Sequence, residues 1–226
     1  MLKPAFILHR KPHSNTSLLL ECFTAADGRF PAIAKGVFAK RTGSSGLLQP
    51  FAPLAIKWVG RGAVKTLAVH EPNGSRIHLA GRALYCGFYI NELVMRLLGR
   101  NDPHDELFHL YMETLGRLAT STDFEQPLRW FECLFLAELG YGMQLEHEAE
   151  NGDPIELDRY YRYELEHGPL MAKPDAGNTI KGSTLLALAH DTVVDANGRK
   201  EARMLMRQVL AYYLGDRPLK SRELFQ

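Results

Sequence analysis

Residues 17–24 read Ser-Leu-Leu-Leu-Glu-Cys-Phe-Thr, and residues 30–35 read Phe-Pro-Ala-Ile-Ala-Lys. The segment between them contains Asp27-Gly28-Arg29, which has the composition of a tight turn. Short apolar runs separated by turn residues are typical of β-strands, because a helix needs a longer periodic segment. The sequence therefore predicts that the first third of the chain is built from strands.

Further runs of the same kind flank this pair, and they occupy residues 5–10, 51–59 and 64–70. Residues 11–16, with Pro12 and Asn15, are predicted to form a turn, and Gly60-Arg61-Gly62 is predicted to form another. Five short strands without a helix indicate a small antiparallel β-barrel of the OB type over residues 1–79. A sandwich fragment or an SH3-like barrel would share this pattern of strands.

From about residue 80 the apolar residues recur at helical spacing, first at Leu84, Phe88, Leu93 and Leu97. Later helices are predicted over residues 103–118, 126–139, 183–190 and 201–214. Residues 143–178 are acidic, interrupted by Gly and Pro, and irregular, with one possible short strand at residues 160–164. The expected fold class is α+β, with a five-stranded OB-fold barrel followed by a mainly α-helical domain over residues 80–226.

The charges of the chain balance as a whole but are unevenly distributed. The 226 residues carry 27 Lys or Arg and 26 Asp or Glu, a formal net charge of +1. Residues 1–80 hold 11 of these cations and 3 of the acids, whereas residues 81–180 hold 8 cations and 18 acids. A basic first third indicates a polyanionic partner, and a surface whose charges merely balance between domains is the alternative.

Motifs for covalent or metal-dependent catalysis are missing from the sequence. It has no GxxxxGK[ST] phosphate loop, no HExxH helix and no CxxC pair. Cys22, Cys86 and Cys133 are expected to be buried thiols, and we expect no metal and no cofactor. A phosphodiesterase that uses the acidic segment is a minor alternative. No run is apolar and long enough for a bilayer span, and no signal peptide is recognisable, so a cytoplasmic location is expected.

Basic and aromatic residues interleave in the predicted barrel, a pattern typical of surfaces that hold phosphates and stack on bases. Phe51 and Trp58 are more simply expected in the barrel core. The segment 36–46 is rich in Gly and Ser and is expected to form a mobile loop. The candidate DNA-binding residues are Arg10, Lys11, Lys35, Lys40, Arg41, Lys57, Arg61 and Lys65.

Short strings along the whole chain resemble the bacterial RecO family of DNA repair proteins. They include Ala34-Lys35-Gly36, Gly60-Arg61-Gly62, Tyr89-Ile90-Asn91-Glu92-Leu93, Gly140-Tyr141-Gly142 and Pro218-Leu219-Lys220-Ser221-Arg222. Many members of the family carry a four-cysteine zinc module after the fourth of these matches, at Gly140-Tyr141-Gly142. Residues 143–173 contain no cysteine here, so the chain resembles the zinc-free branch.

The resemblance implies a mediator of recombinational repair that is not an enzyme. Such proteins bind single- and double-stranded DNA and anneal complementary strands in the cytoplasm, at the nucleoid. With RecR, and sometimes RecF, they help to load RecA onto DNA coated by single-stranded DNA-binding protein (SSB). They also bind the acidic SSB tail, which ends in Phe, through their helical domain. The positions that correspond to this tail-binding site are Arg129, Lys200, Arg203 and Arg207, and either Arg199 or Lys200 can share a helix side with the last two.

Two other classes of function fit the same residues. An RNA-binding OB-fold protein in RNA processing or translation would use the same cations and aromatic rings, and competition between DNA and RNA strands would separate the two. A scaffold that contacts only proteins would place its basic surface against an acidic partner. Salt-sensitive binding of nucleic acid would exclude that scaffold.

Overall fold

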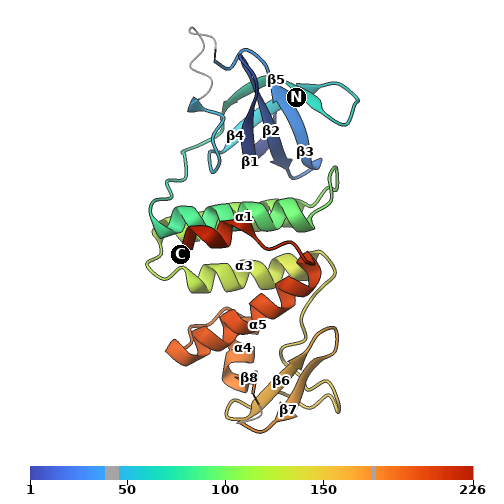
Figure 1. Cartoon of the computed structure of the whole chain (residues 1–226), viewed down its shortest axis with the longest axis vertical. Helices are drawn as coiled ribbons and strands as arrows, with labels where there is room; N and C mark the ends of the chain where they lie inside the picture. Colours follow the sequence, from blue (N-terminus) through green and yellow to red (C-terminus); the bar gives the residue numbers. More distant parts are fainter. Residues whose placement is uncertain (39–45, 175–176, 226) are drawn as a thin grey trace. The chain divides into compact units, whose positions relative to one another are not determined.

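The computed structural model describes residues 1–38, 46–174 and 177–225, which form two compact units (Figure 1). Most of the loop predicted at residues 36–46 lies outside the described residues. Unit 1 contains Met1–Ser121 and the C-terminal residues from Leu219 onward, and unit 2 contains Thr122–Pro218. The boundary predicted at residues 79 and 80 therefore lies just after the barrel strands, whereas the compact units divide at residues 121 and 122.

Unit 1 begins with a closed five-stranded barrel in the order β1-β2-β3-β5-β4. All neighbouring strands are antiparallel except β3 and β5, which run parallel. The closed barrel leaves no strand edge unpaired, and it confirms the OB-type barrel that the sequence predicts. The strands are β1 (Lys3–Ser14), β2 (Ser17–Thr24), β3 (Gly28–Ala34), β4 (Leu54–Val59) and β5 (Lys65–Pro72).

The barrel interior is filled by apolar side chains from all five strands, among them the fully buried Ile7, Leu20 and Ile56. Trp58, which was predicted in this core, lies half-buried at its edge, with its ring centroid 4.6 Å from that of Phe30. The Lys3 ammonium lies 5.3 Å from the centroid of the Trp58 ring, within the range of a cation–π contact. Trp58 therefore lies at the boundary between the barrel core and the surface.

Phe51, the second aromatic residue predicted in the barrel core, is buried against helix α1 (Arg82–Leu97). Its ring centroid lies 5.3 Å from that of Phe88. A Cβ atom at Gly87 would lie 2.9 Å from the Phe51 ring, so this approach of the ring to the helix requires glycine. Phe51 thus packs on α1, whereas Leu48 of the same segment belongs to the barrel core.

The turn predicted at residues 11–16 is shorter in the structure, because β1 continues to Ser14. Lys11 pairs with Leu19 and Pro12 with Leu18, and only Asn15 and Thr16 form the turn. A register shift follows Pro12. Proline has no backbone N–H to donate, so a strand tolerates it at such an irregularity.

Helices α1 and α2 (Asp105–Thr120) pack on the outside of β1 and β2. The buried amide of Asn91 donates from Nδ2 to the carbonyl oxygen of Leu8 at 2.8 Å, and it accepts a 2.7 Å hydrogen bond from the Tyr111 hydroxyl. Buried polar groups cost free energy unless they are hydrogen-bonded. This chain of contacts therefore fixes α1 and α2 on the barrel in one position.

The C-terminal 3-10 helix η2 (Lys220–Phe225) returns to α1. The Glu92 carboxylate accepts hydrogen bonds from the backbone N–H groups of Lys220 and Ser221, at 2.9 and 2.8 Å, and from the Ser221 hydroxyl at 2.6 Å. Burial raises the pKa of Glu92. The hydrogen bonds from Ser221 and Lys220 and the nearby Arg96 together lower this pKa by more than burial raises it, so the net shift is downward. The ionised form is therefore the one that holds η2.

Replacing Glu92 with glutamine is expected to loosen η2, because hydrogen bonds to a charged group contribute about 1.5–3 kcal/mol each before solvent screening. Hydrogen exchange at the amides of Lys220 and Ser221 should then be about tenfold faster. The pKa of Glu92 is lower in the folded protein, so its contribution is present above the unfolded pKa and lost as the pH falls through the folded one. Unchanged exchange at neutral pH would contradict this role.

Unit 2 combines three helices with a small sheet. The helices are α3 (Glu125–Glu138), α4 (Gly182–His190) and α5 (Ala196–Leu214). The sheet has the order β7-β6-β8, formed by β6 (Tyr160–Glu164), β7 (Gly168–Ala172) and β8 (Thr179–Lys181). α5 packs against α3, α4 and β8, so it forms the centre of the unit.

Two predictions for unit 2 need correction. The possible strand at residues 160–164 is confirmed as β6, but the segment 143–178 also contains β7, which pairs with β6 and was predicted as irregular chain. In addition, α5 begins at Ala196, five residues before the predicted start, where Asp195 accepts a 2.7 Å hydrogen bond from the Gly198 N–H and caps the helix.

Candidate functional site

The predicted DNA-binding cations in the described part of the barrel lie in two groups along its strands. Lys11 pairs with Leu19 beside the β1–β2 turn, and Lys35 follows Ala34, which pairs with Leu18. Lys57 instead follows Ile56, which pairs with Lys3 at the start of β1, so β4 and the β4–β5 turn extend away from the β1–β2 turn. We call the two groups together the cationic surface, and it comprises Arg10, Lys11, Lys35, Lys57, Arg61 and Lys65.

Most of these side chains are accessible. The exposed members are Lys11, Lys35, Lys57 and Arg61. Lys65 and Arg10 are half-buried, and the Arg10 guanidinium donates to the carbonyl oxygen of Leu48 at 3.3 Å. Lys40 and Arg41, which were predicted for the same surface, lie outside the described residues. The described cations can therefore reach a ligand in solvent at modest entropic cost.

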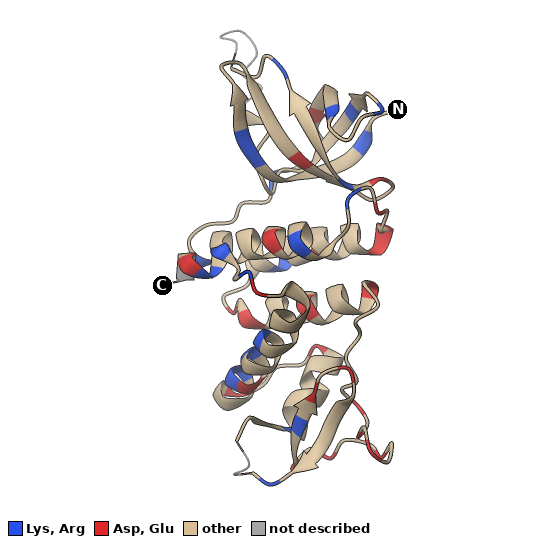
Figure 2. Ribbon diagram, turned by 45° about the vertical axis from the view of Figure 1, so that its right-hand side comes forward, with Lys and Arg blue, Asp and Glu red and all other residues tan. Residues whose placement is uncertain are grey.

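Two of the three carboxylates of residues 1–80 are held in ion pairs. Glu21 forms an ion pair with Arg29 at 2.6 Å, and Asp27 forms one with Lys3 at 2.7 Å. Figure 2 shows where Lys, Arg, Asp and Glu lie on the ribbon. Residues 1–80 hold 11 cations and 3 acids, so this part of the chain carries a net positive field, which attracts polyanions.

The start of β3 packs against the segment between α1 and α2. The Arg29 side chain donates from Nε to the carbonyl oxygen of Leu98 at 2.6 Å. Gly28 has φ +64°, and a Cβ atom there would collide with the carbonyl oxygen of Asp102. Residues 11–16 and 60–64, which contain the β1–β2 and β4–β5 turns, are exposed. In OB folds these two loops flank the surface that binds oligonucleotides.

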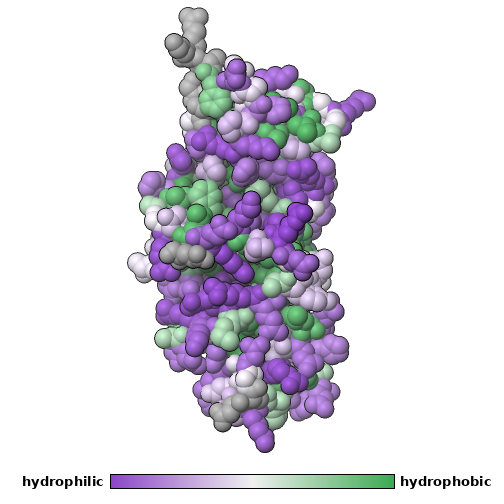
Figure 3. All heavy atoms as spheres, viewed as in Figure 1, coloured by the Kyte–Doolittle hydropathy of each residue, from purple (hydrophilic) through white to green (hydrophobic). Residues whose placement is uncertain are grey.

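Apolar side chains are exposed beside the cations. Phe38 is 47% exposed, and Val59 and Val64 flank the β4–β5 turn with 51% and 46% exposure. Figure 3 shows apolar residues between hydrophilic ones on the visible face of the barrel. An exposed phenyl ring can stack on an unpaired base, while neighbouring cations hold its phosphate. The arrangement therefore suits a single-stranded polyanion with flat apolar groups.

A second candidate site is a pocket in unit 2 between α3, α4 and the start of α5. It encloses about 480 Å³, including its open mouth, and its apolar wall includes Trp130, Leu188 and Val193. Arg129 and Arg199 also line it. An apolar pocket with arginines at its rim suits a ligand that combines an apolar side chain with a carboxylate.

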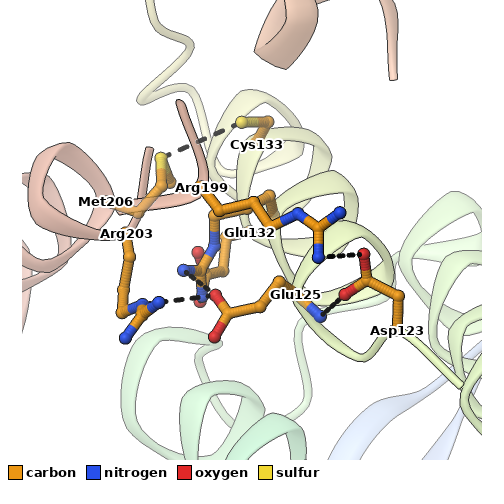
Figure 4. Close-up of polar contacts among 8 residues, drawn as sticks. Asp123, Glu125, Glu132, Cys133, Arg199, Arg203 and Met206 are labelled. Carbon is orange, nitrogen blue, oxygen red and sulfur yellow. Dashed lines mark hydrogen bonds and ion pairs between the residues drawn. The ribbon is translucent and has the colours of Figure 1, made fainter. Parts of the chain in front are cut away.

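Arg129 is the least exposed cation of this pocket, with a side chain 14% exposed. Its guanidinium lies 2.6 Å from the carboxylate of the fully buried Glu132 and 3.5 Å from that of Glu125 (Figure 4). Both acids lie on the same helix, at i+3 and i−4. Neighbouring carboxylates therefore hold the guanidinium in a fixed orientation.

The structure places only some of the cations predicted on α5 at or beside this pocket. Arg203 lies 3.4 Å from Glu125 (Figure 4), and Glu125 in turn lies close to Arg129. Lys200 and Arg207 are exposed, and neither is among the described residues that line the pocket. Arg199, which the sequence offered only as an alternative to Lys200, lines the pocket and pairs with Asp123 at 3.3 Å.

Sequence reasoning missed Trp130 and left Arg199 undecided. The buried side of α5 runs through Ala202, Met206 and Val209. Arg199 precedes Ala202 by three residues, so the two residues are neighbours on the helix surface. An earlier estimate of the helix start would have indicated this. For Trp130 no local signal distinguishes a pocket wall from ordinary helix core.

The cysteine thiols lie in apolar surroundings. Burial raises the pKa of the Cys22 thiol, with a further upward contribution from Glu21, and burial also raises the pKa of the Cys133 thiol to about 12. In the described ranges no three His, Cys, Asp or Glu side chains are placed to hold one metal ion. Among the described helices, none combines the length and apolarity needed to cross a membrane.

Comparison with protein families assigns both parts of the chain. Residues 1–76 match the family described as recombination protein O, N terminal, and residues 78–223 match recombination protein O, C terminal. The junction between the two matches falls where the last barrel strand has ended and before α1 begins.

Full-length relatives agree with this assignment. The chain is 47% identical to the DNA repair protein RecO of Alkalilimnicola ehrlichii over 230 residues, which covers 100% of this chain and 91% of the relative. It is 46% identical to the RecO of Methylococcus capsulatus, with 100% and 93% covered, and 43% identical to that of Haemophilus influenzae PittGG, with 99% and 95% covered. The chain therefore belongs to the RecO family of recombinational DNA repair proteins.

Proposed function

We propose that this protein binds single- and double-stranded DNA through the cationic surface of its barrel and anneals complementary strands. The observation that carries the proposal is the excess of accessible cations on the barrel: Lys11, Lys35, Lys57 and Arg61 are exposed, whereas the carboxylates of Glu21 and Asp27 are held in ion pairs. The accessible Phe38 ring beside these cations supports contact with unpaired bases.

Annealing by such a surface needs no bond to be broken. Two strands repel each other through their phosphates, and a basic surface lowers this repulsion while it raises the local concentration of both strands. The protein would then act as a non-covalent mediator rather than as an enzyme. RecA loading with RecR, and contact with RecF, belong to the same proposal through family membership.

The pocket of unit 2 is proposed to bind the acidic SSB tail that ends in Phe. Its apolar wall at Trp130 and Leu188 suits a phenyl ring, and Arg129, Arg199 and Arg203 suit carboxylates. Binding of this tail would bring the basic barrel to DNA that is already coated by SSB. The other two predicted cations, Lys200 and Arg207, remain proposals as contacts for the acidic residues that precede the Phe.

An annealing assay tests the first proposal. The purified protein should accelerate pairing of complementary DNA oligonucleotides without ATP, and the effect should fall steeply as salt rises. Competition with RNA strands of equal length and sequence tests the alternative of an RNA-binding protein. Preferential binding of RNA, or no salt-sensitive binding of either strand, would overturn the proposal.

A further inference from the structure

The arginines of the unit 2 pocket are surrounded by carboxylates of the chain itself. Asp123 pairs with Arg199, Glu132 pairs with Arg129, and Glu125 lies within ion-pair distance of two guanidinium groups. An anionic ligand that uses these arginines, as the proposed function requires, must therefore compete with acids that are already in place. The three acids differ in how firmly the fold holds them.

Glu132 and Asp123 each have a structural task. The Glu132 carboxylate is fully buried and lies 2.6 Å from the Arg129 guanidinium, so separating the pair would leave a buried charge. The Asp123 carboxylate accepts a 3.0 Å hydrogen bond from the backbone N–H of Glu125, at the start of α3. Neither acid can leave its place without a cost to the fold.

Glu125 is held more weakly. Its side chain is 30% exposed, and its carboxylate lies 3.5 Å from the Arg129 guanidinium and 3.4 Å from that of Arg203. Both distances exceed the roughly 2.7–2.9 Å of a good charge-assisted hydrogen bond. Figure 4 shows this carboxylate beside the Arg203 guanidinium, and the two arginines come from different helices, α3 and α5. A partly exposed side chain can rotate into solvent, where water replaces the lost ion pairs at little cost.

We infer that Glu125 is an exchangeable carboxylate that holds the place of the ligand's terminal carboxylate between Arg129 and Arg203. When an acidic peptide binds, its carboxylate takes over the two guanidinium groups and Glu125 turns outward. The inference rests on the proposed function. It makes Glu125 a competitor of the ligand for the two arginines, although Glu125 does not itself hold the ligand.

This exchange favours a particular chemical class of ligand. A peptide with a free terminal carboxylate restores both ion pairs that the departure of Glu125 breaks, so its entry is close to neutral in charge pairing. A peptide that ends in an amide cannot take over the two guanidinium groups, so Glu125 keeps its ion pairs when such a peptide binds. Removal of the Glu125 charge should therefore improve binding of free-carboxylate ends above all.

The experiment compares two probes on the full-length chain by fluorescence anisotropy. Both are labelled acidic peptides that end in Phe, one with a free terminal carboxylate and one with a terminal amide. For Glu125→Gln we expect the free-carboxylate peptide to bind about three- to tenfold more tightly than to the unchanged protein, because one competing charge is removed at partial exposure. The amide peptide should change by less than about twofold, since it has no terminal group to place there.

Asp123→Asn is the matched control, because it removes the same charge from the same pocket while its side-chain oxygen can still accept the Glu125 N–H. It should affect both peptides to a similar, small extent. An equal gain for both peptides with Glu125→Gln would show a general field effect and overturn the exchange, as would no gain at all in a protein with an unchanged melting temperature. If the unchanged protein binds neither peptide at low salt, the proposed tail binding itself is overturned.

Discussion

Replacing Lys11, Lys35 and Arg61 together with glutamine is expected to weaken binding of single-stranded DNA about 30-fold at low salt. All three side chains are exposed members of the cationic surface. If each cation neutralises one phosphate, the slope of log K against log salt should become shallower by about 2, since single strands contribute about 0.7 per phosphate. Titration of a labelled oligonucleotide at several salt concentrations measures both quantities.

A matched control removes the same charge elsewhere. Arg159, Arg162 and Lys173 are exposed on unit 2, so their replacement with glutamine changes the net charge equally. This variant should keep its affinity within about threefold, because none of the three side chains belongs to the cationic surface and exposed charges are screened by salt. Equal losses in both variants would mean that net charge, rather than the cationic surface, governs DNA binding. Circular dichroism should show both variants folded.

Replacing Arg129 with alanine is expected to lower the free energy of unfolding of unit 2 by about 3 kcal/mol, the usual cost of leaving a buried charge uncompensated. The uncompensated group is Glu132, which is fully buried beside the guanidinium. The chain has two tryptophans, Trp58 in the barrel and Trp130 in the pocket wall. In a Trp58→Phe background, the fluorescence of Trp130 during urea unfolding reports on unit 2 alone.

The Arg129→Ala variant alone would confuse lost stability with lost binding. Adding Glu132→Gln removes the buried charge, and we expect this double variant to recover most of the lost stability. It should still bind the acidic peptide at least tenfold more weakly, because the carboxylate loses its least exposed arginine. A double variant that binds as well as the unchanged protein would remove Arg129 from the proposed site.

Much of the fold could be predicted because the barrel and the helices have different periods. Residues 17–24 are a strand in both the sequence pattern and the structure, and the apolar spacing of residues 84–97 predicted α1 to within a few residues. The strand β7 was missed, because Gly168-Pro169 at its start reads as a turn. Its position depends on pairing with β6, which a local pattern does not contain.

The candidate site was predictable where it depends on exposure and less so where it depends on packing. Cations in turns, such as Lys35 and Arg61, reach solvent in almost any barrel, so their accessibility followed from the sequence. The pocket required knowledge of which side of α5 faces α3, because that choice places Arg199 in the wall and leaves Lys200 outside it. One helical position separates the two residues, and only tertiary packing decides between them.

The return of η2 to α1 makes unit 2 an insertion within the sequence of unit 1. The polypeptide crosses between the units twice, after Ser121 and after Pro218. During synthesis the ribosome completes all of unit 2 before it adds the residues that Glu92 holds. The barrel can fold early, but unit 1 acquires its last element only after its neighbour exists. Fragments cut at residue 80 or 121 therefore lack part of unit 1. An isolated unit 1 for DNA-binding work should keep α1 and have the segment from Leu219 rejoined to it.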